Sequence, residues 1–136
     1  GFLWYEEPMR EFSIDAYRRL AAALTIPLLS GETSDGAHYN TADFIQFDAA
    51  DMVRTSTGLR GGVTGALRIA HLADAHLMRA EVHGGGLPNL HLCCAIPNTT
   101  YYESLVYTNP ITVEAGIERD GSIAAPVGPG IGWPED

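Results

Sequence analysis

The sequence has 136 residues, the size of one ordinary domain, and its 8 basic and 17 acidic side chains give a formal net charge of −9 at pH 7. Such a charge repels a nucleic-acid backbone and an anionic membrane surface, so we expect neither as a partner. Apolar residues make up 46% of the chain and charged residues 18%, which predicts a buried core rather than disorder.

Short apolar runs alternate with stretches of helical period along most of the chain. The runs that predict strands lie at 2–5, 26–29, 52–53, 77–82 and 101–106. The periodic stretches that predict helices lie at 13–24, with Ser13 as N-cap, and at 40–45, 62–75 and 87–95. Strand followed by helix, four times in a row, predicts an α/β architecture with a parallel sheet. After Pro110 the texture changes to Gly and Pro with short β-like pieces, which indicates hairpins and loops.

Nothing in the sequence predicts a membrane segment or export. No apolar run approaches the roughly 20 residues that cross a bilayer, and the first residues lack the basic start of a signal peptide. The two cysteines, Cys93 and Cys94, are adjacent, and such neighbours rarely pair with each other. They lie in an apolar stretch and are expected to pack there. We therefore expect a reduced, cytoplasmic setting.

Polar side chains follow the predicted strands at the points where the strands end. They are Glu6 and Glu7, Glu32, Ser56, His83 and Glu103. In parallel α/β folds the ligand site lies outside the carboxyl ends of the strands. These residues are therefore the candidates for a functional site.

The carboxylates Glu6, Glu7 and Glu32 follow two neighbouring strands, so they are expected at one rim of the sheet. Like charges at close range repel unless a cation or a proton lies between them. Oxygen ligands alone favour hard cations such as Mg²⁺ or Mn²⁺. The local alternative is that Glu6 precedes a helix start at Pro8 and that Glu32 caps the turn before Asp35.

His83 ends a predicted strand and precedes three glycines. An imidazole at this rim can move a proton near neutral pH, although a histidine there can also be a hydrogen-bonded structural residue. The glycines 84–86 lack the Lys-Ser/Thr of a phosphate-binding loop, so we interpret them as backbone clearance beside a substrate. Glu103 belongs to the same candidate site, unless it pairs with an arginine across the barrel.

Five segments in this order resemble the enolase superfamily, in particular its mandelate racemase subgroup. The separation of Glu6 from Glu32 is 26 residues and that of His83 from Glu103 is 20, as in that subgroup. The tail 126–132 also resembles the closing segment of the family. The segments that carry the resemblance are Trp4–Pro8, Ile26–Glu32, Gly61–Gly65, His83 and Tyr102–Glu103.

The resemblance implies a fold: the C-terminal part of a TIM-like (β/α) barrel, covering roughly strands 4 to 8. Residues 1–109 would form this barrel portion, and residues 110–136 a tail of hairpins and loops that returns toward the capping domain. A complete eight-stranded barrel needs about 250 residues. We therefore expect the chain to be the C-terminal portion of a longer enzyme.

The resemblance also implies roles for the rim residues. Glu6 and Glu32 resemble the second and third carboxylates that bind Mg²⁺, and Glu7 their supporting neighbour. His83 resembles the general acid/base, and Glu103 the carboxyl group that hydrogen-bonds the substrate carboxylate as it becomes an enediolate. Ser56 stands where the subgroup usually has an Asp hydrogen-bonded to the histidine, so the usual His–Asp pair is expected to be altered.

The function that follows from the resemblance is a Mg²⁺-dependent lyase. It would abstract the proton α to a carboxylate and dehydrate a sugar acid to a 2-keto-3-deoxy acid, as a homo-oligomer in its full-length form. One alternative is an isomerase of the same superfamily, either a racemase/epimerase or a sugar-acid cycloisomerase. The other is a fragment that is inactive without the missing N-terminal part.

Overall fold

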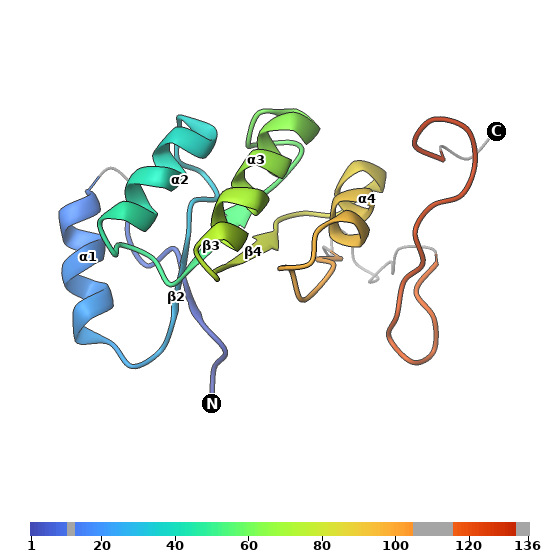
Figure 1. Cartoon of the computed structure of the whole chain (residues 1–136). Coiled ribbons are helices and arrows are strands. Elements are labelled where there is room, and N and C mark those ends of the chain that lie inside the picture. Colours follow the sequence, from blue (N-terminus) through green and yellow to red (C-terminus); the bar gives the residue numbers. More distant parts are fainter. Residues whose placement is uncertain (11–12, 105–115, 133–136) are drawn as a thin grey trace.

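The computed structural model describes residues 1–10, 13–104 and 116–132. Its centre is a parallel four-stranded sheet in the order β1-β2-β3-β4, and each strand is followed by a helix. Figure 1 shows the four helices in chain order along the sheet, from α1 to α4. The strands are β1 (Tyr5–Glu6), β2 (Leu28–Ser30), β3 (Met52–Thr55) and β4 (Arg79–Val82), and the helices are α1 (Ile14–Ala23), α2 (Ala37–Gln46), α3 (Gly62–Ala75) and α4 (Leu87–Ala95).

The repeated strand–helix pattern is confirmed, and the longest helix matches its predicted range. Helix α3 spans Gly62–Ala75 and α4 spans Leu87–Ala95, as the apolar period predicts. Helix α1 begins directly after Ser13, whose side chain accepts a hydrogen bond from the backbone N–H of Ala16 at 3.3 Å. Helix α2 is longer than predicted, because Gly36 adopts a positive φ of 86° and lets the helix start at Ala37.

The strands predicted at 26–29, 52–53 and 77–82 are present with bounds shifted by up to two residues, and the two other strand predictions are wrong. The first strand is not 2–5 but Tyr5–Glu6, because only these two residues pair with β2, while Phe2 is 91% exposed. Residues 101–104 form no strand, and 105–106 lie outside the described residues. Near residue 103, the backbone N–H groups of Gly84 and Gly86 donate to side-chain oxygens instead of joining a strand ladder.

The core lies between the sheet and its helices in two clusters. The larger one joins β3 and β4 to α3 and α4, and its members include Val53, Ile69, Val82 and Leu92. The smaller one joins α1, β2 and α2 around Tyr17, Leu28 and Phe44. Because side chains alternate across a strand, the neighbours of the core residues in β3 and β4 point to the other face of the sheet. Arg54 and Glu81 occupy those positions, in register with each other.

The described part of the tail contains one hairpin and packs on α4. Ile117 and Ile123 form an antiparallel bridge, and the N–H of Glu118 donates to the carbonyl of Ser122 at 2.8 Å. A ring nitrogen of His91 lies 3.0 Å from the carbonyl oxygen of Ile131. The β-like piece predicted at 111–114 lies outside the described residues. Within the described ranges, no helix is long and apolar enough to span a bilayer.

The start of α3 packs closely on the loop before it. Gly65 lies in the first turn of α3, and a Cβ atom at this position would be 2.0 Å from the carbonyl oxygen of Arg60. The Arg60 side chain is buried and donates to the backbone carbonyls of Ser34 and Ala37. The close approach at Gly65 therefore keeps Arg60 in reach of the loop that follows Glu32.

We predict that Gly65→Ala destabilises the protein by at least about 2 kcal/mol, because the new methyl group would displace backbone rather than a flexible side chain. Alanine has a higher helix propensity than glycine, so the substitution would stabilise the protein if helix propensity alone decided the outcome. Urea denaturation of the full-length protein measures the change. Gly58→Ala is the matched control, since its Cβ would meet only the Ser56 hydroxyl at 3.8 Å. Equal stability of the two variants would contradict the packing argument.

Candidate functional site

Five charged or titratable side chains meet beside the carboxyl ends of the strands. Glu6 ends β1, Glu32 follows β2 by two residues, Arg54 lies in β3 and His83 directly follows β4. Glu103 reaches the same place from the irregular segment after α4 and accepts a hydrogen bond from the N–H of Gly84 at 2.9 Å. We call these five residues the rim cluster.

The rim cluster forms one continuous line of contacts. Oε1 of Glu32 lies 3.3 Å from Nε2 of His83, and Nδ1 of His83 lies 3.1 Å from Oε2 of Glu103. The contact at Nδ1 has the distance of an ion pair but lacks the alignment of a hydrogen bond. Oε2 of Glu103 is in turn 3.7 Å from Nη1 of Arg54, whose Nε donates to Oε1 of Glu6 at 2.7 Å. The imidazole therefore lies between two carboxylates.

Glu7 supports the loop that carries Glu32. Its Oε1 accepts a hydrogen bond from the backbone N–H of Glu32 at 2.5 Å, and its Oε2 lies 3.4 Å from the hydroxyl of Thr33. The backbone of Glu7 has a φ of 38°, a left-handed conformation that costs a non-glycine residue about 1–3 kcal/mol. The strained residue directly after Glu6 thus connects the two loops that carry candidate ligands, as expected of a supporting residue.

The rim cluster holds three carboxylates and one permanent cation, Arg54, and charges of both signs act on Glu32. Burial raises the pKa of Glu32 above its ordinary value, and the nearby charges of Glu6 and Glu103 raise it further. His83 and Arg54 act in the opposite direction and lower it, but they do not reverse the shift. The cluster therefore holds more negative charge than its own cation neutralises, so an added cation would be stabilised there.

The loop after His83 is held by Asn89, a buried residue of α4. Its Nδ2 donates to the carbonyls of His83 and Gly84 at 2.9 and 3.0 Å and lies 3.3 Å from that of Gly85. Its Oδ1 accepts from both the backbone N–H and the hydroxyl of Thr57 at 2.9 Å. Asn89 thus joins the loop after β3 to the loop that carries the imidazole.

Ser56 lies beside the rim cluster without contacting the imidazole. Its hydroxyl accepts a hydrogen bond from the N–H of Gly58 at 3.2 Å. In the part of the chain that the structure describes, no hydrogen bond joins Ser56 to His83, and Glu103 is the carboxylate that faces Nδ1. The hypothesis that the serine takes over the place of an Asp partner therefore has no contact to support it.

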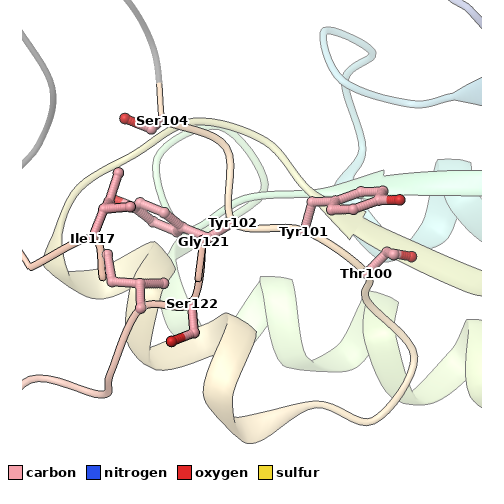
Figure 2. Close-up of a pocket in the computed structure, with 8 residues that line it drawn as sticks. Thr100, Tyr101, Tyr102, Ser104, Ile117, Gly121 and Ser122 are labelled. Carbon is pink, nitrogen blue, oxygen red and sulfur yellow. The ribbon is translucent and has the colours of Figure 1, made fainter. Parts of the chain in front are cut away.

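The segment that carries Glu103 also borders a cavity that is separate from the rim cluster. Tyr102 and Ser104, the neighbours of Glu103, line a cavity of about 260 Å³ together with tail residues 117 and 121–123 (Figure 2). None of the five rim residues lines it. The tail hairpin thus packs against this segment, away from the rim cluster.

The comparison with known proteins agrees with the geometry. The family profile described as enolase C-terminal domain-like matches residues 1–134. The chain belongs to this family. It is 33% identical over 128 residues to L-talarate/galactarate dehydratase of Salmonella typhimurium, a match that covers 89% of this chain and 30% of that enzyme.

Two further proteins of the enolase superfamily are similar to this chain. One is a D-glucarate dehydratase from Agrobacterium tumefaciens, solved in complex with magnesium, with a TM-score of 0.87 and 36% identity over 97% of this chain and 37% of that one. The other is D-galactarolactone cycloisomerase of Agrobacterium fabrum, 34% identical over 63% of this chain and 22% of that enzyme. The chain spans less than two fifths of these relatives. The expected family and the barrel fold are thereby confirmed.

The candidate ligands of this enolase-family domain fit Mg²⁺ in their chemistry. Glu6 and Glu32 offer hard carboxylate oxygens from neighbouring strand ends, in a cluster with excess negative charge. Within the described ranges, no three Asp, Glu, His or Cys side chains are grouped as a metal would need. Glu6 and Glu32 remain candidate ligands, without a third such residue grouped with them in the described part of the chain.

Sequence reasoning missed two residues of the site, Arg54 and Asn89. An arginine inside a short apolar strand signals a partner on the far face of the sheet, and the register with β4 shows which face that is. Asn89 stands in an otherwise apolar helix, and a buried amide needs partners for its polar atoms. Both signals are visible in the sequence, but neither identifies the partner.

The cysteines carry no sign of chemistry. Both are free, and Cys93 is half-buried beside the larger core cluster while Cys94 is exposed. Burial raises the pKa of Cys93 to about 11, which keeps its thiol protonated at neutral pH. Packing, as expected from the sequence, describes Cys93 but not Cys94.

We predict that Asn89→Asp lowers the free energy of unfolding by about 1–3 kcal/mol, because a carboxylate would face two or three carbonyl oxygens with no proton to donate. Chemical denaturation at pH 7 measures the loss. Asn40→Asp is the matched control, since the Asn40 side chain accepts from the Ser34 hydroxyl at 2.5 Å and an Asp keeps that acceptor. A loss no larger than in the control would show that Asn89 does not hold the loop of His83.

Proposed function

We propose that the complete protein is a Mg²⁺-dependent dehydratase of sugar acids, which converts an aldonate or aldarate to a 2-keto-3-deoxy acid. The observation that carries the proposal is His83 between the carboxylates of Glu32 and Glu103, at the strand ends that also bear Glu6. The dehydratases of talarate, galactarate and glucarate among its relatives favour this substrate class. The proposal concerns the full-length protein, because this chain spans only part of those enzymes.

The first step of the reaction removes a proton that is only weakly acidic. A proton α to a carboxylate can be removed only if the negative charge that develops on the substrate is stabilised. Bound Mg²⁺ would supply that charge stabilisation, with Glu6 and Glu32 as the ligands from this chain. His83 accepts the α-proton on a ring nitrogen, and the resulting imidazolium can give a proton to the β-hydroxyl as it leaves as water.

Glu103 contributes at the other side of the imidazole. Its Oε2 faces three groups, the Gly84 N–H, His83 and Arg54. Among the described residues, none contacts Oε1, so this oxygen is available to a hydroxyl or carboxyl group of the substrate. Glu103 therefore orients both the base and the substrate in this proposal.

The second candidate function is a cycloisomerase, favoured by the similarity to D-galactarolactone cycloisomerase. It shares the abstraction of the α-proton by His83 and differs in the group that leaves. A racemase would need a second base on the opposite face of the substrate. The proposal also includes a homo-oligomeric full-length protein and a cytoplasmic location.

Product analysis separates these functions. The full-length protein, with Mg²⁺, is incubated with a panel of aldonates, aldarates and their lactones, and the products are identified by NMR and by the carbonyl assay for 2-keto acids. A 2-keto-3-deoxy acid formed with loss of water supports the dehydratase. Ring opening of a lactone supports the cycloisomerase, and exchange of the α-proton alone supports an epimerase. No turnover and no α-proton exchange across the panel would overturn the proposal.

We predict that His83→Asn lowers kcat at least about 10³-fold while Tm and Mg²⁺ content stay close to the wild-type values, because the imidazole transfers protons. Glu103→Gln is expected to lose less, since an amide keeps a hydrogen-bonding group at that point. His91→Asn is the matched control, because the ring of His91 bonds the tail carbonyl of Ile131 and is not part of the rim cluster. Loss of the folded state in His83→Asn would instead indicate a structural histidine.

A further inference from the structure

Arg54 is the one permanent cation of the rim cluster, and the sheet places it there. Its neighbour Val53 packs in the larger core cluster, so alternation along β3 directs Arg54 to the opposite face. Its side chain is only 8% exposed. A guanidinium keeps its charge at any physiological pH, so burial at this position requires partners.

The partners of Arg54 are on three sides. Nε and Nη2 both contact Oε1 of Glu6, at 2.7 and 2.5 Å, which makes this the shortest ion pair of the rim cluster. Nη1 donates to the carbonyl of Val82 at 3.2 Å and lies 3.7 Å from Glu103. The carbonyl holds the guanidinium in place from the neighbouring strand. The ion pair with Glu6 is therefore made by a fixed cation rather than by a mobile surface side chain.

Glu6 is also the candidate metal ligand on β1. Its Oε1 is taken by Arg54, and its Oε2 accepts from the indole N–H of Trp4 at 3.2 Å. A divalent cation that binds Glu6 must either share Oε1 with the guanidinium or bind Oε2 of the same carboxylate, and both positions lie close to the charge of Arg54. Two cations at one carboxylate repel each other strongly where water is largely excluded.

We propose that Arg54 is a positioning residue that neutralises Glu6 while no metal is bound and competes with a divalent cation for that carboxylate. The proposal rests on the Mg²⁺ site of the proposed function. It follows that Arg54 weakens the affinity of the site for Mg²⁺ and protects the three crowded carboxylates from mutual repulsion when the metal is absent. Repulsion between the two cations should then move the guanidinium away from Oε1 of Glu6 when Mg²⁺ binds, toward the Val82 carbonyl and Glu103, which its Nη1 already faces.

Isothermal calorimetry of Mg²⁺ binding to the metal-free, full-length protein tests the proposal. Arg54→Gln removes the competing charge, so its Kd for Mg²⁺ is expected to fall about tenfold or more. Arg54→Lys keeps the charge but cannot make two parallel contacts, so its Kd should fall less. Arg18→Gln is the control of equal charge change, because Arg18 is exposed on α1, where it pairs with Asp15. A Kd that is unchanged or higher in both Arg54 variants would overturn the proposal.

Thermal melting gives an independent readout. Without metal, Arg54→Gln should melt below the wild type, since its three carboxylates lose their counter-charge, and saturating Mg²⁺ should raise its Tm by more than it raises that of the wild type. If the Gln variant does not fold even with Mg²⁺, the proposal is tested by comparing the Kd of Arg54→Lys for Mg²⁺ with that of the wild type. A wild-type protein that turns over sugar acids and binds Mg²⁺ no less tightly than both variants would overturn the role of Arg54 alone. A wild type that binds no Mg²⁺ would overturn this role and the proposed metal site together.

Discussion

The crowding of carboxylates at the strand ends is the constraint on which the site depends. A parallel register brings the ends of β1 and β2 to one edge, and the loop after β2, which Glu7 holds, carries Glu32 to the same edge as Glu6. Glu103 adds a third negative charge from the segment after α4. The other residues of the site act in two ways: some offset this repulsion with positive charge, and others hold the loops that carry the charged side chains. Arg54 and His83 lie between the carboxylates and offset the repulsion.

The residues around the rim cluster hold the loops that carry its side chains. Glu7 accepts the backbone N–H of Glu32, and Asn89 binds the carbonyls on both sides of the His83–Gly84 peptide. Arg60, buried behind the loop after β2, donates to two carbonyls of that loop. These contacts position the rim residues through backbone hydrogen bonds, which leaves the reactive side chains free to face one another.

The architecture could be predicted from the sequence more accurately than the individual contacts could, and the reason is physical. Helix α3 was predictable to the residue, because its apolar period is broken by glycines on one side and by a polar end on the other. A strand has no such local signal, because it exists only where a neighbour pairs with it. This is why the first strand shifted to Tyr5–Glu6 and why residues 101–104 do not form one.

The same distinction applies to the site. The positions of Glu6, Glu32 and His83 after strands could be predicted, since parallel strands end at one edge. The role of Arg54 could not, because it depends on the face to which β3 turns it and on the register with β4. The contact of Glu103 with Nδ1 of His83, where Ser56 was expected, depends on a segment of irregular backbone that no period describes.

A crystal structure of the full-length protein soaked with Mn²⁺, with anomalous scattering recorded at the manganese edge, tests the central claim that the rim cluster is a metal-assisted site of proton transfer. We predict an anomalous peak at bonding distance, about 2.2 Å, from carboxylate oxygens of both Glu6 and Glu32. We also predict that His83 stays beside Glu103 and that Arg54 no longer contacts Oε1 of Glu6. A manganese ion bound elsewhere, with Oε1 of Glu6 still paired to Arg54, would contradict the account.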